Sequence, residues 1–93
     1  MQRLTLSSAI ERNNEILATA IDGEFVMMSI DTGKYYGLNS VGSRIWELIA
    51  QPTSVESVCE TLLGEFSVEK QKCEKEVLDI LQQMFQKNLV VVK

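Results

Sequence analysis

The 93-residue chain is 45% hydrophobic, which fits one folded domain spanning residues 1–93 rather than a disordered segment. Its net charge of −4 argues against a nucleic-acid-binding surface, because phosphate recognition needs concentrated positive charge. The sequence contains no histidine, which excludes Ser-His-Asp and Cys-His catalysis and histidine metal ligation. No enzymatic activity, metal or other cofactor is therefore expected.

The first fourteen residues carry weak structural signals. Leu4 and Leu6 alternate with polar residues, which indicates a short strand at a sheet edge, and residues 7–14 are expected to form a loop or a single turn. A basic-then-apolar signal pattern is missing, and no apolar run reaches the roughly 20 residues of a membrane span. We therefore expect a cytosolic protein without membrane contact.

Two hairpins are predicted between residues 15 and 38. Asp22-Gly23 favours a two-residue turn between strands at 15–21 and 24–30, with Leu17 opposite Met28. A loop at residues 31–33 would lead into a third strand at 34–38, with Met28 opposite Tyr36. These registers would gather one apolar set on one sheet face: Leu17, Val26, Met28, Tyr36 and Leu38. The opposite face would hold Ile16, Ala18, Ala20, Phe25, Met27 and Tyr35, and would need cover.

The strand at 34–38 is predicted to be a docking edge for an extended peptide. It is aromatic-rich and has one charge and no proline, so it lacks most features that stop a sheet edge from pairing. Two interpretations remain open: the protein's own N- or C-terminal strand covers this edge, or a foreign peptide pairs with it. In the second case, alternate peptide side chains would enter a groove beside the third helix, and the acidic protein surface would favour basic residues in the peptide.

Three helices and a closing strand complete the predicted order. Asn39 or Ser40 caps the first helix, which ends before Pro52. Thr53 and Glu56 form a capping box for the second helix, and the third helix spans about residues 68–87, before a strand at 89–92. This layout is α+β and winged helix-turn-helix-like, with an N-terminal three-stranded antiparallel meander followed by three helices.

Three features of the second and third helices are weighed as further sites: a DNA-reading helix, a pair of carboxylates and a pair of cysteines. Residues 67–88 carry four positive and four negative charges, so the third helix lacks the basic surface of a DNA-reading helix. Glu74 and Asp79 are expected on its solvated face, paired with nearby lysines rather than catalytic. Cys59 and Cys73 fall at apolar positions, which favours two buried free thiols over the alternative of a disulfide or redox pair.

The run of residues 32–48 resembles the PqqD-like family, and looks most like the small stand-alone members of lasso-peptide gene clusters. The matched pattern is Tyr-Tyr-x-Leu-Asn followed by Gly-x-x-Ile-Trp, at Tyr35, Tyr36, Leu38, Asn39, Gly42, Ile45 and Trp46. The likeness covers nearly the whole chain in the same order of elements. Gln51-Pro52 stands where the family member of pyrroloquinoline quinone synthesis has an Asp-Gly pair, which favours a role outside quinone-cofactor synthesis.

The resemblance implies a RiPP recognition element: a non-catalytic domain that binds the leader segment of a ribosomally made precursor peptide as an added strand. It would present the leader to a separate leader peptidase and cyclase, and act as a monomer or weak dimer. Carried over by position, the peptide-binding residues would be Lys34, Tyr35, Tyr36, Gly37 and Leu38 on one wall and Cys73, Glu76, Val77 and Ile80 on the other. The alternatives are a winged-helix DNA-binding regulator and a PqqD-type carrier for a radical-SAM maturase.

Overall fold

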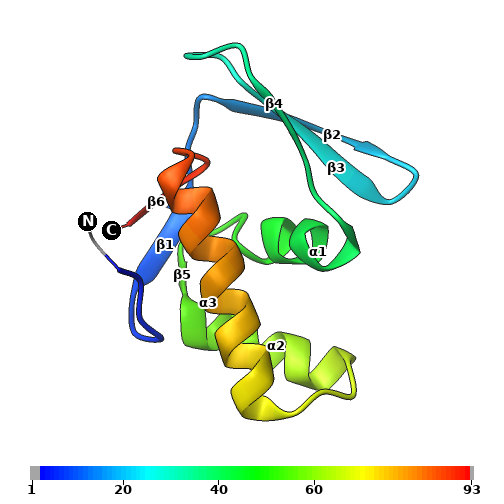
Figure 1. Ribbon diagram of the computed structural model, residues 1–93, viewed down its shortest axis with the longest axis vertical. Coiled ribbons are helices and arrows are strands. Elements are labelled where there is room, and N and C mark those ends of the chain that lie inside the picture. The colour runs from blue at the N-terminus through cyan, green and yellow to red at the C-terminus, as the bar shows by residue number, and fades with distance from the viewer. Residues whose placement is uncertain (1–2, 93) are drawn as a thin grey trace.

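Six strands and three helices make up residues 3–92, the part of the chain that the computed structural model describes. The strands are β1 (Ala9–Arg12), β2 (Ile16–Ile21), β3 (Glu24–Ser29), β4 (Tyr35–Gly37), β5 (Thr53–Ser54) and β6 (Val90–Val92). The helices are α1 (Ser40–Leu48), α2 (Val55–Glu65) and α3 (Lys70–Gln86). The α+β, winged helix-turn-helix-like layout is therefore confirmed, with the meander β2-β3-β4 at the end of the molecule opposite α2 (Figure 1).

The first hairpin has the predicted register. Ile21 lies opposite Glu24 and Leu17 opposite Met28, as expected for a two-residue turn. Both turn residues have positive φ, 54° at Asp22 and 83° at Gly23, which is the conformation that Asp-Gly adopts readily. Local turn chemistry therefore sets this pairing.

The predicted register of the second hairpin is wrong by one residue. Met28 lies opposite Tyr35 rather than Tyr36. The loop closes one residue earlier than expected, because the N–H of Ser29 donates to the carbonyl of Lys34 at 2.9 Å. The N–H of Gly33 donates to the carbonyl of Ser29 at 2.8 Å, and the buried Ser29 hydroxyl accepts from the N–H of Thr32 at 3.3 Å. Four residues, rather than three, thus separate the paired strands.

This shift overturns the predicted division of the sheet faces, because moving a strand by one residue exchanges its two faces. Tyr36 and Leu38 lie on the inner face with the fully buried Met27, where they pack against the core. Tyr35 lies on the outer face with Leu17, and these two side chains are 71% and 54% exposed. The inner face is covered by the helices and the outer face is open.

A second sheet has the strand order β5-β1-β6. The predicted loop at residues 7–14 is wrong, because β1 is the central strand: Ile10 lies opposite both Thr53 and Val92. The predicted strand around Leu4 and Leu6 is also wrong. Leu4 instead buries its side chain beside α3, and its N–H donates to Oε1 of Gln82 at 2.9 Å.

The helix termini follow local capping rules. Oδ1 of Asn39 accepts from the N–H of Gly42 at 2.8 Å, which confirms Asn39 as the cap of α1. The cap of α2 is Ser54 instead of Thr53, because the Ser54 hydroxyl oxygen accepts from the N–H of Ser57 at 3.1 Å. Cys59 and Cys73 are both buried free thiols, as predicted.

The core lies between the two sheets and the three helices, and α3 crosses its full length (Figure 1). The first part of α3 packs against α2, whereas its last turns lie near β6 and the meander (Figure 1).

Within residues 3–92, no helix combines the length and apolar character needed to cross a bilayer.

Candidate functional site

One edge of the meander is open. Among the described residues, β4 pairs with β3 alone, while the N-terminal strand β1 and the C-terminal strand β6 pair with each other. The alternative in which the chain's own terminal strand covers β4 is therefore wrong for residues 3–92. The edge predicted from its composition is available for another strand.

The hydrogen-bond pattern identifies which backbone groups face the open side. The carbonyl of Lys34 and the N–H of Leu38 both point toward β3, with N···O distances of 2.9 Å to Ser29 and to Phe25. Backbone groups alternate in direction along an antiparallel strand, so those of Tyr36 also point toward β3. The N–H and C=O groups of Tyr35 and Gly37 then face outward, and this edge offers two donors and two acceptors.

A cavity of about 400 Å³ lies directly beside this edge. Its walls come from β4, from the start of α1 and from the second half of α3 and the residues after it. The lining residues are Tyr35, Tyr36, Gly37, Leu38, Asn39, Gly42, Ile80, Gln83, Met84, Lys87 and Leu89, and we call this cavity the β4–α3 groove. An open strand edge and an adjoining groove are the two parts that strand addition requires.

Ser43 holds β4 and α1 together at one end of the groove. Its buried hydroxyl accepts from the N–H of Phe25 at 2.9 Å and donates to the carbonyl of Leu38 at 3.2 Å. Gly42 lies close by, and a Cβ at this position would be 3.4 Å from both Leu38 Cδ2 and Asn39 Oδ1. The Leu-Asn and Gly-x-x-Ile-Trp parts of the family pattern thus position the strand relative to the helix.

Arg12 links the second sheet to α1. Its Nε donates to the carbonyl of Trp46 at 3.0 Å, and its guanidinium carbon lies 4.6 Å from the centre of the indole ring. Partial burial lowers the pKa of Arg12, while the nearby Glu47 carboxylate raises it. The buried Trp46 is therefore a structural residue and lies outside the groove lining.

The structure brings five of the nine predicted peptide-contact residues into the groove: Tyr35, Tyr36, Gly37, Leu38 and Ile80. Lys34, Cys73, Glu76 and Val77 do not line it. Cys73 and Val77 are only 5% and 2% exposed, because this half of α3 buries its apolar side in the core beside α2. Glu76 is solvent-exposed on the same half.

The groove-lining residues that the sequence analysis did not predict on this side lie one and two helical turns beyond Ile80. Gln83, Met84 and Lys87 follow Ile80 at spacings of three, four and seven, so they share one side of the helix. That spacing is visible in the sequence and could have extended the predicted wall from Ile80. The half of α3 that meets β4 is set by tertiary packing, which the spacing does not reveal.

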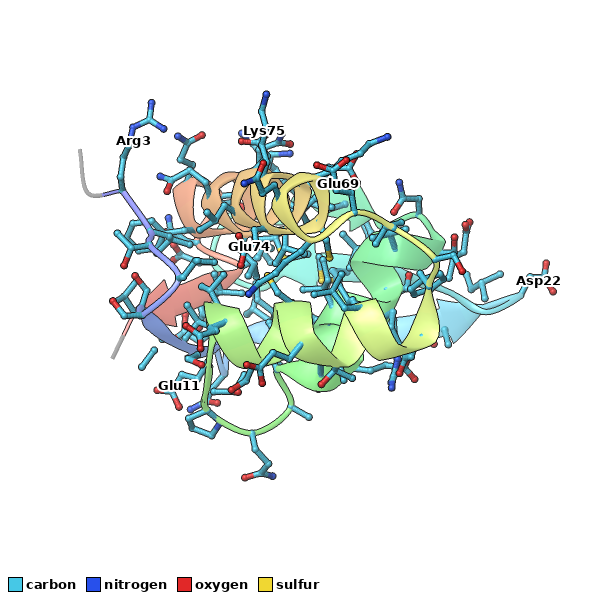
Figure 2. All side chains as sticks on the ribbon, turned by 90° about the horizontal axis from the view of Figure 1, so that it is seen from below. Arg3, Glu11, Asp22, Glu69, Glu74 and Lys75 are labelled. Carbon is cyan, nitrogen blue, oxygen red and sulfur yellow. The ribbon has the colours of Figure 1, made fainter. Side chains whose placement is uncertain are left out.

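Charged groups are sparse in the groove. Lys87 is the one charged residue of the lining, and its Nζ lies 5.4 Å from the centre of the Tyr36 ring. Figure 2 shows Lys75 of α3 and Glu69, the residue before α3, extending on the side away from α2, where they are exposed to solvent. Within residues 3–92, no three His, Cys, Asp or Glu side chains are grouped to hold a metal.

The two thiols have the properties of core groups rather than of nucleophiles. Burial raises the pKa of Cys59 to about 11, and it also raises the pKa of Cys73. A thiol needs a lowered pKa and solvent access to act as a nucleophile at neutral pH. The arrangement at the groove can therefore bind an extended segment but provides no activated cysteine.

Comparisons with known proteins agree with this geometry. The family model described as coenzyme PQQ synthesis protein D (PqqD) matches residues 24–90. A structure of TbiB1 in complex with the TbiA(beta) leader peptide is 31% identical, with a TM-score of 0.81 over 86% of this chain and 93% of that chain. No curated protein sequence matches the chain.

Two more distant structures share the fold. A lasso peptide synthetase B1 complexed with the leader peptide is 20% identical, with a TM-score of 0.79 over 88% of this chain and 96% of that chain. The PqqD truncation of Methylobacterium extorquens PqqCD, described as a stand-alone RiPP recognition element, is 12% identical. Its TM-score is 0.78, over 95% of this chain and 94% of that chain.

Proposed function

The chain belongs to the PqqD family, and from this premise we propose that it is a non-catalytic adaptor that captures the leader segment of a ribosomally made precursor peptide. The leader would add to the meander as a fourth strand beside β4. The observation that carries the proposal is the open edge of β4 with the β4–α3 groove along it. We place this step in lasso-peptide maturation in the cytoplasm.

The other free edge of the meander serves this purpose less well. Strand β2 is also an edge strand and is longer than β4. The lining of the β4–α3 groove includes no β2 residue, so a strand added at β2 would place its side chains outside that groove. Specificity in strand addition comes from the pockets that receive alternate side chains, which favours β4.

Backbone pairing alone would give weak binding. Four hydrogen bonds to Tyr35 and Gly37, at about 1 kcal/mol net each, amount to roughly 4 kcal/mol, which corresponds to a Kd near 1 mM. To reach a micromolar affinity, side chains in the groove would have to supply the rest of the binding free energy. The apolar part of the lining, formed by Leu38, Ile80, Met84 and Leu89, suits one or two apolar anchors on the leader.

Leader binding is supported by sequence as well as by fold, and the lasso-peptide pathway by the resemblance of residues 32–48 to members of lasso-peptide gene clusters. The chain is 31% identical to the leader-bound TbiB1 but 12% identical to the PqqD truncation of M. extorquens PqqCD. Gln51-Pro52, in place of the Asp-Gly pair expected of the quinone-pathway member, favours the same choice.

We also propose that the partner is a separate leader peptidase, followed by a cyclase, and that the peptidase docks on the outer face of the meander. Four large apolar side chains are exposed there: Leu17 (54%), Ile21 (56%), Ile30 (57%) and Tyr35 (71%). Tyr35 also lines the groove. Alternate side chains of an added leader strand would extend this same face, so an enzyme docked on it would contact both adaptor and leader.

Charge favours such an enzyme over a second copy of this chain. Residues 15–38 carry Glu15, Asp22, Glu24 and Asp31 against Lys34, a net charge of −3. Asp22 extends from the tip of the first hairpin, away from the helices (Figure 2). Two such faces would repel each other, whereas a partner with an apolar patch ringed by basic residues would complement this one. The adaptor itself would then act as a monomer.

The strand-addition step is tested by a pair of substitutions at Gly37. Gly37→Pro removes an N–H that faces the open edge while sparing the bonds to β3, and proline is tolerated on such an edge. Gly37→Ala keeps the N–H, and its Cβ would meet no atom within 4 Å. Tyr36→Pro would be a poor test, because it removes an N–H directed toward β3.

The probe is the fluorescein-labelled leader of the precursor peptide that the proposal places in the same gene cluster, followed by fluorescence anisotropy. We expect Gly37→Pro to weaken binding by about tenfold or more, the loss of one backbone bond and its strand geometry, and Gly37→Ala to bind like the wild type. Equal binding by a folded Gly37→Pro variant would contradict strand addition at β4.

The peptidase docking step is tested separately with Leu17→Arg, which should leave the leader affinity unchanged and slow cleavage of the precursor by the cluster's peptidase. Glu69→Lys, which changes the exposed side of α3 seen in Figure 2, is the control. Unchanged cleavage with Leu17→Arg would remove the outer face from the proposal.

A further inference from the structure

Building on the proposed function, we propose that Lys87 makes the β4–α3 groove select leaders that carry an Asp or Glu beside Tyr36, two residues away from an apolar anchor beside Leu38. This determinant differs from the expectation that the acidic protein surface favours basic residues in the peptide. The overall charge is −4, but the lining of the groove itself carries one charge, and that charge is positive.

The position of Lys87 is fixed by the end of α3. It is the C-cap residue, and its N–H donates to the carbonyl of Gln83 at 3.1 Å. Its side chain extends over the Tyr36 ring, with Nζ 5.4 Å from the ring centre. The ammonium therefore lies above an inner-face residue of the strand that receives the leader.

The ammonium has no carboxylate partner among residues 3–92. The ion pairs there join Arg44 to Glu47 and to Glu65, on a different part of the surface. The other polar side chains of the lining are the amides of Asn39 and Gln83 and the hydroxyls of Tyr35 and Tyr36. A carboxylate on the leader would give Lys87 a partner that the protein itself does not supply.

Strand geometry fixes the spacing of the two selected residues. Tyr36 and Leu38 both point to the inner face of the sheet, because they lie two residues apart on β4. Residues of an added strand that lie beside them also point inward and are also two apart, whichever way the strand runs. The selected pattern is therefore acidic-x-apolar, or its reverse.

The size of the effect follows from covering the groove. In the free protein Lys87 is exposed, so a carboxylate near it would be worth little. A bound strand excludes water from the contact, and one charge-assisted hydrogen bond then changes affinity by roughly tenfold or more. A lysine that only stabilises the end of α3 would leave the preference for peptide sequences unchanged.

The experiment selects from a random dodecapeptide display library with four proteins: the wild type, Lys87→Gln, Lys87→Glu and the control Lys34→Gln. Lys34 is the other lysine at this edge and is exposed, but it does not line the groove. Gly37→Pro is used to discard peptides that bind elsewhere. Circular dichroism confirms that each variant is folded.

We expect the wild type and Lys34→Gln to enrich Asp or Glu at one position, two residues from an aliphatic or aromatic residue. Lys87→Gln should lose the acidic preference, and Lys87→Glu should replace it with Lys or Arg. For a synthesised wild-type binder, changing the acidic residue to its amide should weaken binding by about tenfold at low salt and less at high salt.

Peptides that bind β4 without an acidic position, or with one that persists in Lys87→Glu, would overturn the role of Lys87 and leave leader capture intact. A wild-type selection that yields no peptide sensitive to Gly37→Pro would overturn the proposed function itself.

Discussion

Ser43→Ala should destabilise the protein by removing the hydroxyl that connects β3, β4 and α1. Two hydrogen bonds are lost, from the N–H of Phe25 at 2.9 Å and to the carbonyl of Leu38 at 3.2 Å. Ser43 is 3% exposed, so water cannot replace the hydroxyl in an unchanged structure. The unpaired N–H of Phe25 costs about 1–3 kcal/mol, and we expect a loss near 2 kcal/mol in the free energy of unfolding.

Urea denaturation followed by circular dichroism measures this loss, and thermal unfolding should show a Tm lower by about 10 °C for a domain of this size. Ser40→Ala is the matched control, because Ser40 lies on the same helix, is exposed and forms none of the side-chain hydrogen bonds found within residues 3–92. The free energy of unfolding of this variant should differ from that of the wild type by less than about 0.5 kcal/mol. A Ser43→Ala variant as stable as Ser40→Ala would refute the role given to the hydroxyl.

Val77→Asp should abolish cooperative folding, because it places an unpaired charge at a position that is 2% exposed. Glu76→Lys, at the adjacent exposed position, should fold normally. A Val77→Asp protein that is folded by circular dichroism would contradict this prediction. Gly33→Ala should cost about 1–2 kcal/mol in urea denaturation, because φ is +72° there, although a Cβ would meet no atom. Burial raises the pKa of Cys59 to about 11, so the unfolded chain ionises this thiol first. Its contribution to stability should be complete below about pH 8.5 and should fall as the pH rises toward 11, a decline that Cys59→Val should reduce.

Features fixed by neighbouring residues were predictable from the sequence. Asp22-Gly23 sets the first hairpin because both residues tolerate positive φ, and Asn39 caps α1 because its side chain reaches the N–H three residues later. The apolar spacing of α2 predicted its burial at Val55 and Leu62. These choices involve few residues and little competition from the rest of the fold.

Two other features were not predictable in the same way, one because its partners are distant in the sequence and one because composition does not decide between two registers. Strand β1 exists because Ile10 lies between β5 and β6, which come 43 and 82 residues later at Thr53 and Val92. The second hairpin shifted by one residue because Ser29 pairs with Lys34, a local choice that composition leaves undecided. That one shift determined which tyrosine lies on the inner face of the sheet.

The groove was predicted in large part on its strand side, where residues 35–38 line it but Lys34 does not, and on its helix side only at Ile80. The edge could be recognised from its own residues, because an unprotected strand is a property of that strand. The helix wall extends from Ile80 to Lys87, since the first half of α3 is buried against α2. A helix with a wide apolar surface does not show in its sequence which part serves the core and which part borders a groove.

The most direct test of leader capture is amide hydrogen exchange of the 15N-labelled protein, with and without the leader, read residue by residue along β4. Strand addition predicts that the leader slows exchange at Tyr35 and Gly37, whose N–H groups face the open edge, and changes Tyr36 little, because its N–H is already directed toward β3. Slowed exchange confined to β2, or no change at Tyr35 and Gly37 when the leader is saturating, would contradict capture at this edge.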